Sequence, residues 1–255
     1  MLIDTHAHAQ LGSGRGSHLA AVVLASTQRN DWELVKRYEA GPVFARAYGV
    51  HPWWPSSENF LGPLEALLKE EPSALVGEIG LDGLRPNFDL QLSNFRGQFE
   101  LAADLDRPIT THCVKAFGPL RTVFEETTRL PPAIAMHSYT GSWDFARDLN
   151  RLAEKKGSKL YFGFSNFVNG RQKAARREAL IKKLPDDRIL IESDLEDAAA
   201  IDDHLDLALK LVAQAKGWTT DQTIAQCQAN AHTFIQKGCS SLEATPSSSL
   251  DDRIK

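Results

Sequence analysis

The chain has 255 residues, of which 42% are hydrophobic and 24% are charged, and its formal net charge is −4. This apolar content excludes a chain that is disordered throughout. The absence of any apolar run of about 18 residues excludes a membrane span. The weak negative charge excludes a global basic field that would hold nucleic acid, although a local basic patch remains compatible with it. The length suits a single large domain.

The cysteines and the first residues indicate a cellular compartment. Cys113, Cys227 and Cys239 are odd in number and widely spaced, which argues against a disulfide framework or a cysteine zinc ribbon and favours a reducing environment. The segment from Met1 to His8 has neither the charged region nor the apolar region of a signal peptide. We therefore expect a cytoplasmic or nuclear protein that is not secreted.

Short apolar segments alternate with helical patterns along most of the chain. Several of these segments are continuously apolar, which is typical of strands in a parallel sheet covered on both faces. The predicted strands are Leu2–His6, Ala20–Ser26, Val43–Gly49, Ala74–Ile79, Pro108–His112, Ala133–His137, Lys159–Phe162 and Arg188–Glu192. Between them, apolar residues recur with helical spacing, as in Leu92, Phe95 and Phe99 or in Leu205, Leu209 and Val212.

The strand–helix alternation predicts a (β/α)8 TIM barrel, because the unit repeats roughly eight times over about 200 residues. A doubly wound open sheet is the alternative, but no G-x-G-x-x-G turn follows the first strand. We expect the barrel domain to span residues 1–238. Residues 239–255 are rich in Ser, Thr, Pro and charge, and are predicted to form a flexible tail.

Metal-ligand residues stand at or near the ends of five predicted strands. They are His6, His8, Glu78, His112, His137 and Asp194. Any one of these histidines could be a hydrogen-bonded core residue. Together they indicate a site, because the carboxyl ends of barrel strands converge on one mouth, where the active sites of this fold lie. Four imidazoles and two carboxylates can hold two divalent metal ions, with one carboxylate bridging them.

The ligand types leave the metal open. Histidines favour zinc or another late divalent ion, whereas phosphoryl transfer often uses magnesium or manganese. Two ions of Zn, Mg or Mn are therefore expected.

Six sequence blocks occur in an order that resembles the TatD family of metal-dependent deoxyribonucleases, which are amidohydrolase-like TIM barrels. The blocks are His6-Ala7-His8, Gly49-Val50-His51-Pro52, Gly77 to Asp82, Thr111-His112-Cys113, His137 to Ser142 and Glu192-Ser193-Asp194. The resemblance covers residues 2 to roughly 235. It implies a hydrolase that cleaves phosphodiester bonds of DNA, working from a strand end.

The resemblance also implies a role for each block. His6, His8 and Asp194 resemble the ligands of one metal, while Glu78 resembles the bridge to a second metal. His112 and His137 resemble the remaining ligands of that second metal. Asp194 further resembles the catalytic acid that orients the attacking water. His51 resembles a loop histidine that approaches substrate, although a capping role beside Pro52 is equally compatible.

Two departures from the family concern the substrate-facing loops. Where many members carry Cys-Arg-Asp-Ala, this chain reads Cys113-Val114-Lys115-Ala116, so Lys115 would replace the missing arginine as a substrate contact. Where many members read Glu-Thr-Asp-x-Pro, Leu195 and Glu196 follow Asp194 here. The pattern is closer to a eukaryotic branch of the family, the Cut9-interacting type. The departures concern the substrate-facing loops, whereas the metal-ligand set is intact.

A basic run, residues 171–177, follows the seventh strand on the side of the predicted metal mouth. Arg171 and Lys173 in this run are candidate phosphate contacts, although a solvated helix face is an equal alternative. Trp53, Trp54, Tyr139 and Trp143 could stack on bases or simply pack against loops. DNA is thus the expected partner of a protein that we expect to be monomeric.

Two other functions remain open. One is an amidohydrolase-type cleavage of C–N or C–O bonds in a small molecule, since two metals alone do not name the bond. The other is an interaction protein that retains the metal site and binds a protein partner.

Overall fold

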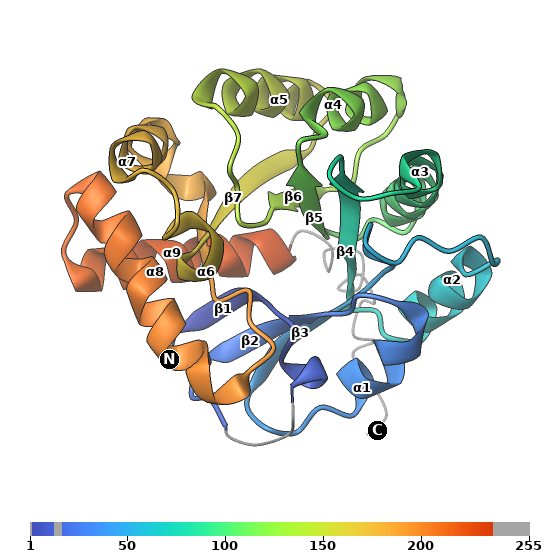
Figure 1. Ribbon diagram of the computed structural model, residues 1–255, viewed down its shortest axis with the longest axis horizontal. Helices are drawn as coiled ribbons and strands as arrows, with labels where there is room; N and C mark the ends of the chain where they lie inside the picture. The colour runs from blue at the N-terminus through green and yellow to red at the C-terminus, as the bar shows by residue number, and fades with distance from the viewer. Residues whose placement is uncertain (1, 13–16, 237–255) are drawn as a thin grey trace, which may run out of the picture.

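The structure is a computed structural model that describes residues 2–12 and 17–236. Its strands form one parallel sheet in the order β1 to β8, and helices surround the sheet (Figure 1). The strands are β1 (Ile3–Ala7), β2 (Ala21–Ala25), β3 (Val43–Tyr48), β4 (Leu75–Asp82), β5 (Ile109–Val114), β6 (Ala133–Met136), β7 (Lys159–Ser165) and β8 (Ile189–Glu192). The predicted (β/α)8 barrel is confirmed.

The helices follow the strands along the chain and cover the outer face of the sheet. They are α1 (Trp32–Lys36), α2 (Leu61–Glu70), α3 (Phe88–Asp104), α4 (Phe117–Glu126), α5 (Trp143–Lys155), α6 (Asn166–Asn169), α7 (Ala174–Lys183), α8 (Ile201–Lys216) and α9 (Thr220–Gln236). Short 3-10 turns lie at Ala9–Leu11, Arg29–Asp31, Asp186–Arg188 and Ala198–Ala200. The predicted apolar stripes of α3 and α8 face the core, since Phe95, Phe99, Leu205 and Leu209 are buried.

Three strands extend two or more residues beyond their predicted ends, and a glycine accounts for the extension of one of them. β4 continues past Ile79 to Asp82, β5 continues past His112 to Val114, and β7 continues past Phe162 to Ser165. Gly80 has a φ of 149°, and a Cβ there would lie 2.0 Å from the carbonyl oxygen of His112. Glycine therefore lets β4 run in close contact with β5, where the sequence pattern indicates the end of a strand.

The barrel closes through a seam between β8 and β1 that differs from the strand ladders elsewhere. The backbone N–H of Asp194 donates to the carbonyl oxygen of His6 (3.0 Å), and the hydroxyl of Thr5 donates to that of Ile191 (3.0 Å). The buried carboxylate of Asp4 accepts from the backbone N–H of Ser193 (3.0 Å). Side chains thus complete what is a nearly closed barrel. The seam also fixes Asp194 against β1.

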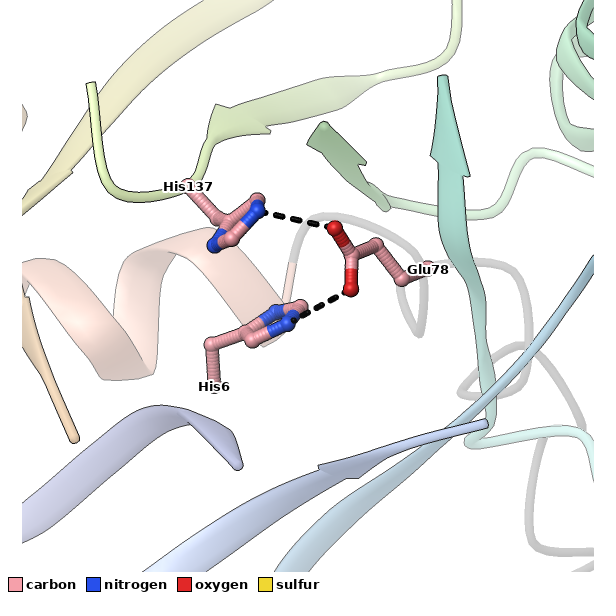
Figure 2. A group of neighbouring side chains, drawn as sticks. All are labelled: His6, Glu78 and His137. Atoms are coloured by element: carbon pink, nitrogen blue, oxygen red, sulfur yellow. Dashed lines mark hydrogen bonds and ion pairs between the residues drawn. The ribbon is translucent and has the colours of Figure 1, made fainter. Parts of the chain in front are cut away.

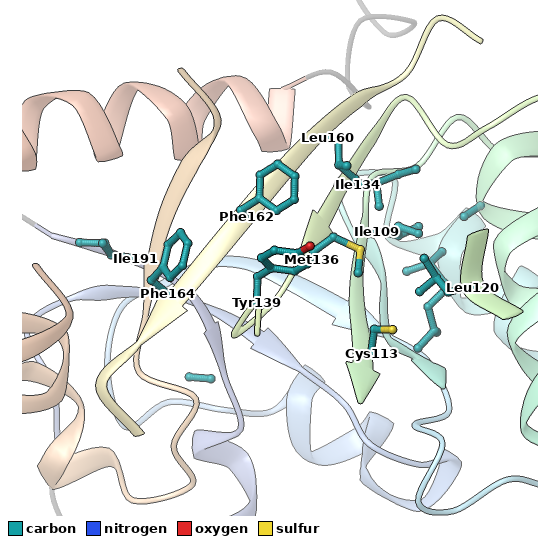
Figure 3. Packing of buried hydrophobic residues seen from close by; sticks show 14 of the residues in the cluster. Ile109, Cys113, Leu120, Ile134, Met136, Tyr139, Leu160, Phe162, Phe164 and Ile191 are labelled. Atoms are coloured by element: carbon teal, nitrogen blue, oxygen red, sulfur yellow. The ribbon is translucent and has the colours of Figure 1, made fainter. Parts of the chain in front are cut away.

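The outer face of β5 to β8 packs against helices through aliphatic, aromatic and sulfur-containing side chains (Figure 3). A second cluster fills the inside of the barrel and includes Tyr161 and Phe234, whose rings lie 5.4 Å apart. Because Phe234 belongs to α9, this helix closes one end of the barrel interior. The functional residues lie at the other end, where the strands finish.

The predicted tail, residues 239–255, and Cys239 lie outside the described residues. Cys113 and Cys227 are free and buried. Within residues 2–12 and 17–236, none of the helices combines the length and apolar character needed to cross a bilayer.

Candidate metal centre

The six predicted metal ligands all lie at the carboxyl end of the barrel. His6 stands in β1 and His8 directly follows that strand. Glu78 and His112 lie in β4 and β5, whereas His137 and Asp194 follow β6 and β8. The parallel strands therefore bring together residues that are up to 188 positions apart, as the sequence pattern predicts. All six are buried except Asp194, whose side chain is 12% exposed.

The carboxylate of Glu78 occupies the centre of the group. Its Oε2 lies 3.1 Å from the Nε2 atoms of both His6 and His8. Its Oε1 lies 2.8 Å from Nε2 of His137 and 3.0 Å from Nδ1 of His112. Figure 2 shows Glu78 between His6 and His137, with one carboxylate oxygen toward each ring. Each oxygen thus faces its own pair of imidazoles, which is the arrangement that a bridging carboxylate needs.

His6 and His8 form the first imidazole pair, and His112 and His137 form the second. In each ring, the outer nitrogen is the one that points away from Glu78. In the first pair, the outer nitrogens lie within hydrogen-bond distance of oxygen atoms. Nδ1 of His8 donates to the carbonyl oxygen of Ala25 (2.7 Å), since a carbonyl can only accept. Nδ1 of His6 lies 2.8 Å from the hydroxyl of Thr110. With its proton on Nδ1, the neutral His8 presents a lone pair at Nε2, the atom that faces Glu78. In the same tautomer, His6 also presents a lone pair at Nε2, the atom that faces Glu78.

Two carboxylates face the outer nitrogens of the second pair. Oδ2 of Asp82 lies 3.5 Å from Nε2 of His112, and Oε1 of Glu192 lies 3.6 Å from Nδ1 of His137. The backbone N–H of Ser138 also donates to Oε1 of Glu192. Carboxylates in these positions favour the tautomers whose inner nitrogens carry lone pairs, as in the carboxylate–histidine–metal arrangements of metalloenzymes.

His51 differs from these four histidines. The backbone N–H of Trp53 donates to its Nδ1 (3.1 Å), so this atom is the acceptor and the proton of the neutral ring lies on Nε2. Nε2 lies 3.2 Å from Oε1 of Glu78 and can donate to it. Although His51, Glu78 and His112 lie close enough to hold an ion, the hydrogen bonding of His51 favours a donor role over a ligand role.

Within each imidazole pair, the nitrogens aim at one another. Nε2 of His6 lies 3.2 Å from Nε2 of His8, and Nδ1 of His112 lies 3.2 Å from Nε2 of His137. When both rings of a pair are neutral and in the tautomers described above, two lone pairs meet at this distance, and a cation between them would relieve the repulsion. Tetrahedral zinc with bonds of about 2.0–2.1 Å would place its nitrogen ligands roughly 3.3 Å apart. The residues present therefore fit a divalent ion at each pair.

Asp194 completes the group from the β8 side. Its Oδ1 lies 3.9 Å from Nε2 of His8 and 4.0 Å from Nε2 of His6. Its backbone adopts a left-handed conformation, with a φ of 59°, and its N–H is anchored by His6 across the seam. The hydroxyl of Ser138 donates to its Oδ2 (3.3 Å). Asp194 thus belongs with the His6–His8 pair, which matches one of the groups that could hold an ion.

The charges of the group depend on one another. Burial raises the pKa of Glu78, but His137, His51 and His6 outweigh this effect and lower it well below its usual value. Burial lowers the pKa of His8, but the carboxylates of Glu78 and Asp194 raise it to about 9. Burial, together with the neighbouring His112, lowers the pKa of His51 to about 4, although the carboxylate of Glu78 raises it. Glu78 is therefore a carboxylate at neutral pH, and His51 is a neutral donor.

A cleft of about 890 Å3 opens above the group, and not all of the predicted substrate contacts line it. His51 does. Lys115 and Lys173 are exposed, and neither contributes to the lining. Arg171 lies outside the lining as well, but its guanidinium sits 4.5 Å above the ring of Phe167, which belongs to the cleft wall. The roles of these residues in substrate binding stay predictions.

The sequence pattern indicates no role for Asp82 or Glu192, although both lie in motifs shared with the family. The signal that could have identified them is a carboxylate inside or at the end of a buried strand, next to a metal ligand. Glu192 stands two residues before Asp194, and Asp82 stands four residues after Glu78. Which histidine each one faces depends on the neighbouring strands, and the sequence does not contain that information.

Comparisons with known proteins agree with this geometry. A family model described as TatD related DNase matches residues 3–236. The Cut9-interacting protein scn1 of Schizosaccharomyces pombe is 29% identical over 232 residues, with 71% of this chain and 68% of the yeast protein covered. The 3'-5' ssDNA/RNA exonuclease TatD of Edwardsiella piscicida is 32% identical over 165 residues, with 61% of this chain and 60% of the enzyme covered. The matched region thus spans less than two thirds of the exonuclease.

Solved structures share the fold. The TatD homologue YJJV from Escherichia coli superimposes with a TM-score of 0.73 at 20% identity, covering 91% of this chain and 97% of that structure. A dihydroorotase superimposes with a TM-score of 0.64 at 15% identity, covering 92% of this chain and 82% of that structure. At these identities the likeness concerns the fold alone.

Proposed function

The chain belongs to the family of TatD-related DNases and is a TatD-type metal-dependent hydrolase, and on that premise we propose that it hydrolyses phosphodiester bonds at an end of single-stranded DNA. The observation that carries the proposal is the position of Glu78, whose two oxygens each face a separate pair of imidazoles. Relatives named as exonucleases support the choice of substrate.

The proposed ligand set follows from the hydrogen bonding of the histidines. His6, His8 and Asp194 would hold one divalent ion, His112 and His137 would hold the other, and Glu78 would bridge them. Two bound ions supply an activated water and neutralise charge on phosphoryl oxygens. Zinc suits the imidazoles, and magnesium or manganese suits phosphoryl transfer.

Three residues of the chain would act on the reacting groups. Asp194 reaches the cleft and can accept the proton of the attacking water. The Ser138 hydroxyl, which donates to Asp194, orients that carboxylate. His51, held neutral with its proton on Nε2, would donate a hydrogen bond to Glu78 in the resting protein and to a phosphoryl oxygen of the substrate.

The deciding experiment compares substrates for one metal-reloaded protein. The protein is stripped with a chelator, reloaded with Zn, Mg or Mn, and assayed on single-stranded DNA labelled at either end and on a panel of esters and amides. We expect mononucleotides to be released from one end of the DNA, and Asp194→Ala to release them at least about 100-fold more slowly.

Two outcomes would contradict the proposal. Turnover confined to amides or small esters would support an amidohydrolase-type reaction. The yeast relative is named for an interaction with Cut9, and an absence of turnover on every substrate, with metal bound, would support an interaction role instead.

A further inference from the structure

Among the described residues, exposed large apolar side chains are concentrated on the wall of the cleft. The described residues include seven exposed large hydrophobic side chains, and four of them line the cleft. These four are Trp53, Trp54, Leu84 and Phe167, with exposed fractions of 44%, 43%, 72% and 37%. Exposed aromatic groups that line a concave site indicate a ligand with an apolar or aromatic face.

Trp53 is held rigidly at this wall. Its indole Nε1–H donates to Oδ2 of Asp82 (2.8 Å), and its backbone N–H donates to His51. Asp82 is fixed in turn, since its Oδ1 accepts the backbone N–H of Leu84 (2.9 Å) and its own N–H donates to Gln91 (2.9 Å). Because the indole Nε1 and the backbone of Trp53 are both anchored, the ring can receive a flat ligand at little conformational cost.

The Trp53 ring lies next to the proposed metal centre. Its centroid is 5.3 Å from that of His51 and 6.3 Å from that of His112, and Trp54 lies 5.8 Å away at an angle of 52°. The guanidinium of Arg85 sits 4.0 Å above the same ring. A nucleotide whose phosphate lies at the metal centre therefore has its base within reach of Trp53.

Charge alone cannot explain how such a cleft would hold DNA. Among the described lining residues, Arg85 is the one arginine, and there is no lysine. The carboxylates of Glu196 and Asp197 add negative charge to the lining, beyond that of the carboxylates at the metal centre. Even with two ions bound, phosphates further along a strand would meet little positive charge.

We propose that Trp53, with Trp54 and Arg85, forms a stacking subsite for the base of the nucleotide beside the scissile phosphate, so that the protein recognises a strand end chiefly by stacking on one base. This proposal rests on the proposed function and names its substrate as a short single-stranded end. Stacking tolerates any base, because every base has an aromatic face.

The test uses single-stranded oligonucleotides that carry one abasic position, placed at the terminal or the penultimate nucleotide of each end, and compares them with the intact strand. For the wild type, one of these abasic substrates is expected to raise KM roughly 5- to 100-fold, which corresponds to the loss of one stacked base. In Trp53→Ala the intact and abasic substrates should have KM values within about twofold of each other.

Two further variants separate stacking from other effects. Trp53→Phe keeps an aromatic face but loses the bond to Asp82, and it should retain most of the discrimination against the abasic substrate. Trp218→Phe is the matched control, because Trp218 also lies under a cation, Lys216 at 5.6 Å, but is outside the cleft lining. It should behave as the wild type. Melting temperatures of all three variants show whether each one is folded.

The outcomes distinguish this proposal from the one on which it rests. If the wild type cleaves intact and abasic strands with equal KM, the stacking subsite is wrong while the nuclease assignment stands. A Trp53→Phe variant that loses discrimination as completely as Trp53→Ala would show that the residue acts through Asp82, which also overturns the subsite. If the wild type cleaves no oligonucleotide, both proposals fail.

Discussion

The Glu78 cluster and the basic run differ in how firmly the fold holds their side chains. The Glu78 cluster comprises His6, His8, His51, Glu78, His112, His137 and Asp194, and its imidazoles each have a partner or a facing carboxylate on the outer nitrogen. The basic run, residues 171–177, comprises the last residues of the connection between α6 and α7 and the start of α7, and Arg171, Lys173 and Arg176 are exposed. The Glu78 cluster is positioned by the ends of buried strands, whereas the basic run lies at the surface.

This difference indicates where the chemistry and the substrate preference reside. A buried cluster with anchored tautomers preserves one geometry, because any change leaves a polar group unpaired. An exposed run tolerates substitution, since solvent replaces a lost contact. We infer that hydrolysis is encoded by the cluster and that substrate selection is encoded by loops, which are also where the chain departs from the family pattern.

The largest effect is expected from the bridging position. Glu78→Gln should reduce the occupancy of both metals and abolish turnover, because one carboxylate serves each imidazole pair. His137→Ala should weaken only the site that it shares with His112. Metal content by mass spectrometry checks this prediction, and two fully occupied sites in the Glu78 variant would show that the bridge assignment is wrong.

Asp194→Ala should lower kcat by about 10²- to 10⁴-fold, which is the usual contribution of a positioned general base, and by more if its metal is also lost. DNA affinity should largely persist, since the cleft walls are unchanged. Fluorescence anisotropy with labelled single-stranded DNA measures this affinity. A parallel collapse of affinity and kcat would place Asp194 in substrate binding instead of proton transfer.

The outer carboxylates should have a smaller effect, confined to metal affinity. Glu192→Gln and Asp82→Asn replace the groups that face His137 and His112, and each should weaken metal binding by about 10- to 100-fold. Calorimetric titration of the apoprotein with zinc measures the change. Glu196→Gln is the control, because Glu196 lines the cleft with no contact to the imidazoles. An equal loss in the control would indicate a general electrostatic effect.

The sequence predicts the strand ends well for a physical reason. A parallel strand buried on both faces leaves an apolar run in the sequence, and a polar residue at its end has few roles other than function. The six candidate ligands could therefore be selected from their positions at strand ends. The same logic cannot assign Asp82 to His112 or Glu192 to His137, because these pairs form between strands whose relative rotation the sequence does not state.

In the basic run, by contrast, the sequence does not predict which side chains are exposed. Arg171, Arg176 and Arg177 look alike in the sequence, yet Arg177 is buried and donates to the carbonyl oxygen of Asn169 (3.1 Å). Its role is to hold α6 against α7, and nothing in the local sequence separates it from its neighbours. Similarly, the tautomer of His51 depends on the backbone N–H of Trp53, which only the loop conformation determines.

The smallest effect is expected within the basic run itself, and it should be uneven. Arg171 packs over Phe167 at the cleft wall, whereas Lys173 precedes α7 and is not one of the lining residues. Arg171→Gln should therefore reduce the log–log salt slope of DNA binding by about 0.7, the value for one lost contact to a single-stranded phosphate. Lys173→Gln should leave the slope unchanged. In both variants kcat should persist, because a contact made equally in the ground and transition states does not alter the chemical step.

Arg177 is left intact in these experiments, since its loss would disturb the α6–α7 packing and confuse the comparison. Equal slopes for the wild type and Arg171→Gln would show that the whole run is a solvated helix face, and a change in Lys173→Gln as large as that in Arg171→Gln would show that DNA follows the run beyond the cleft.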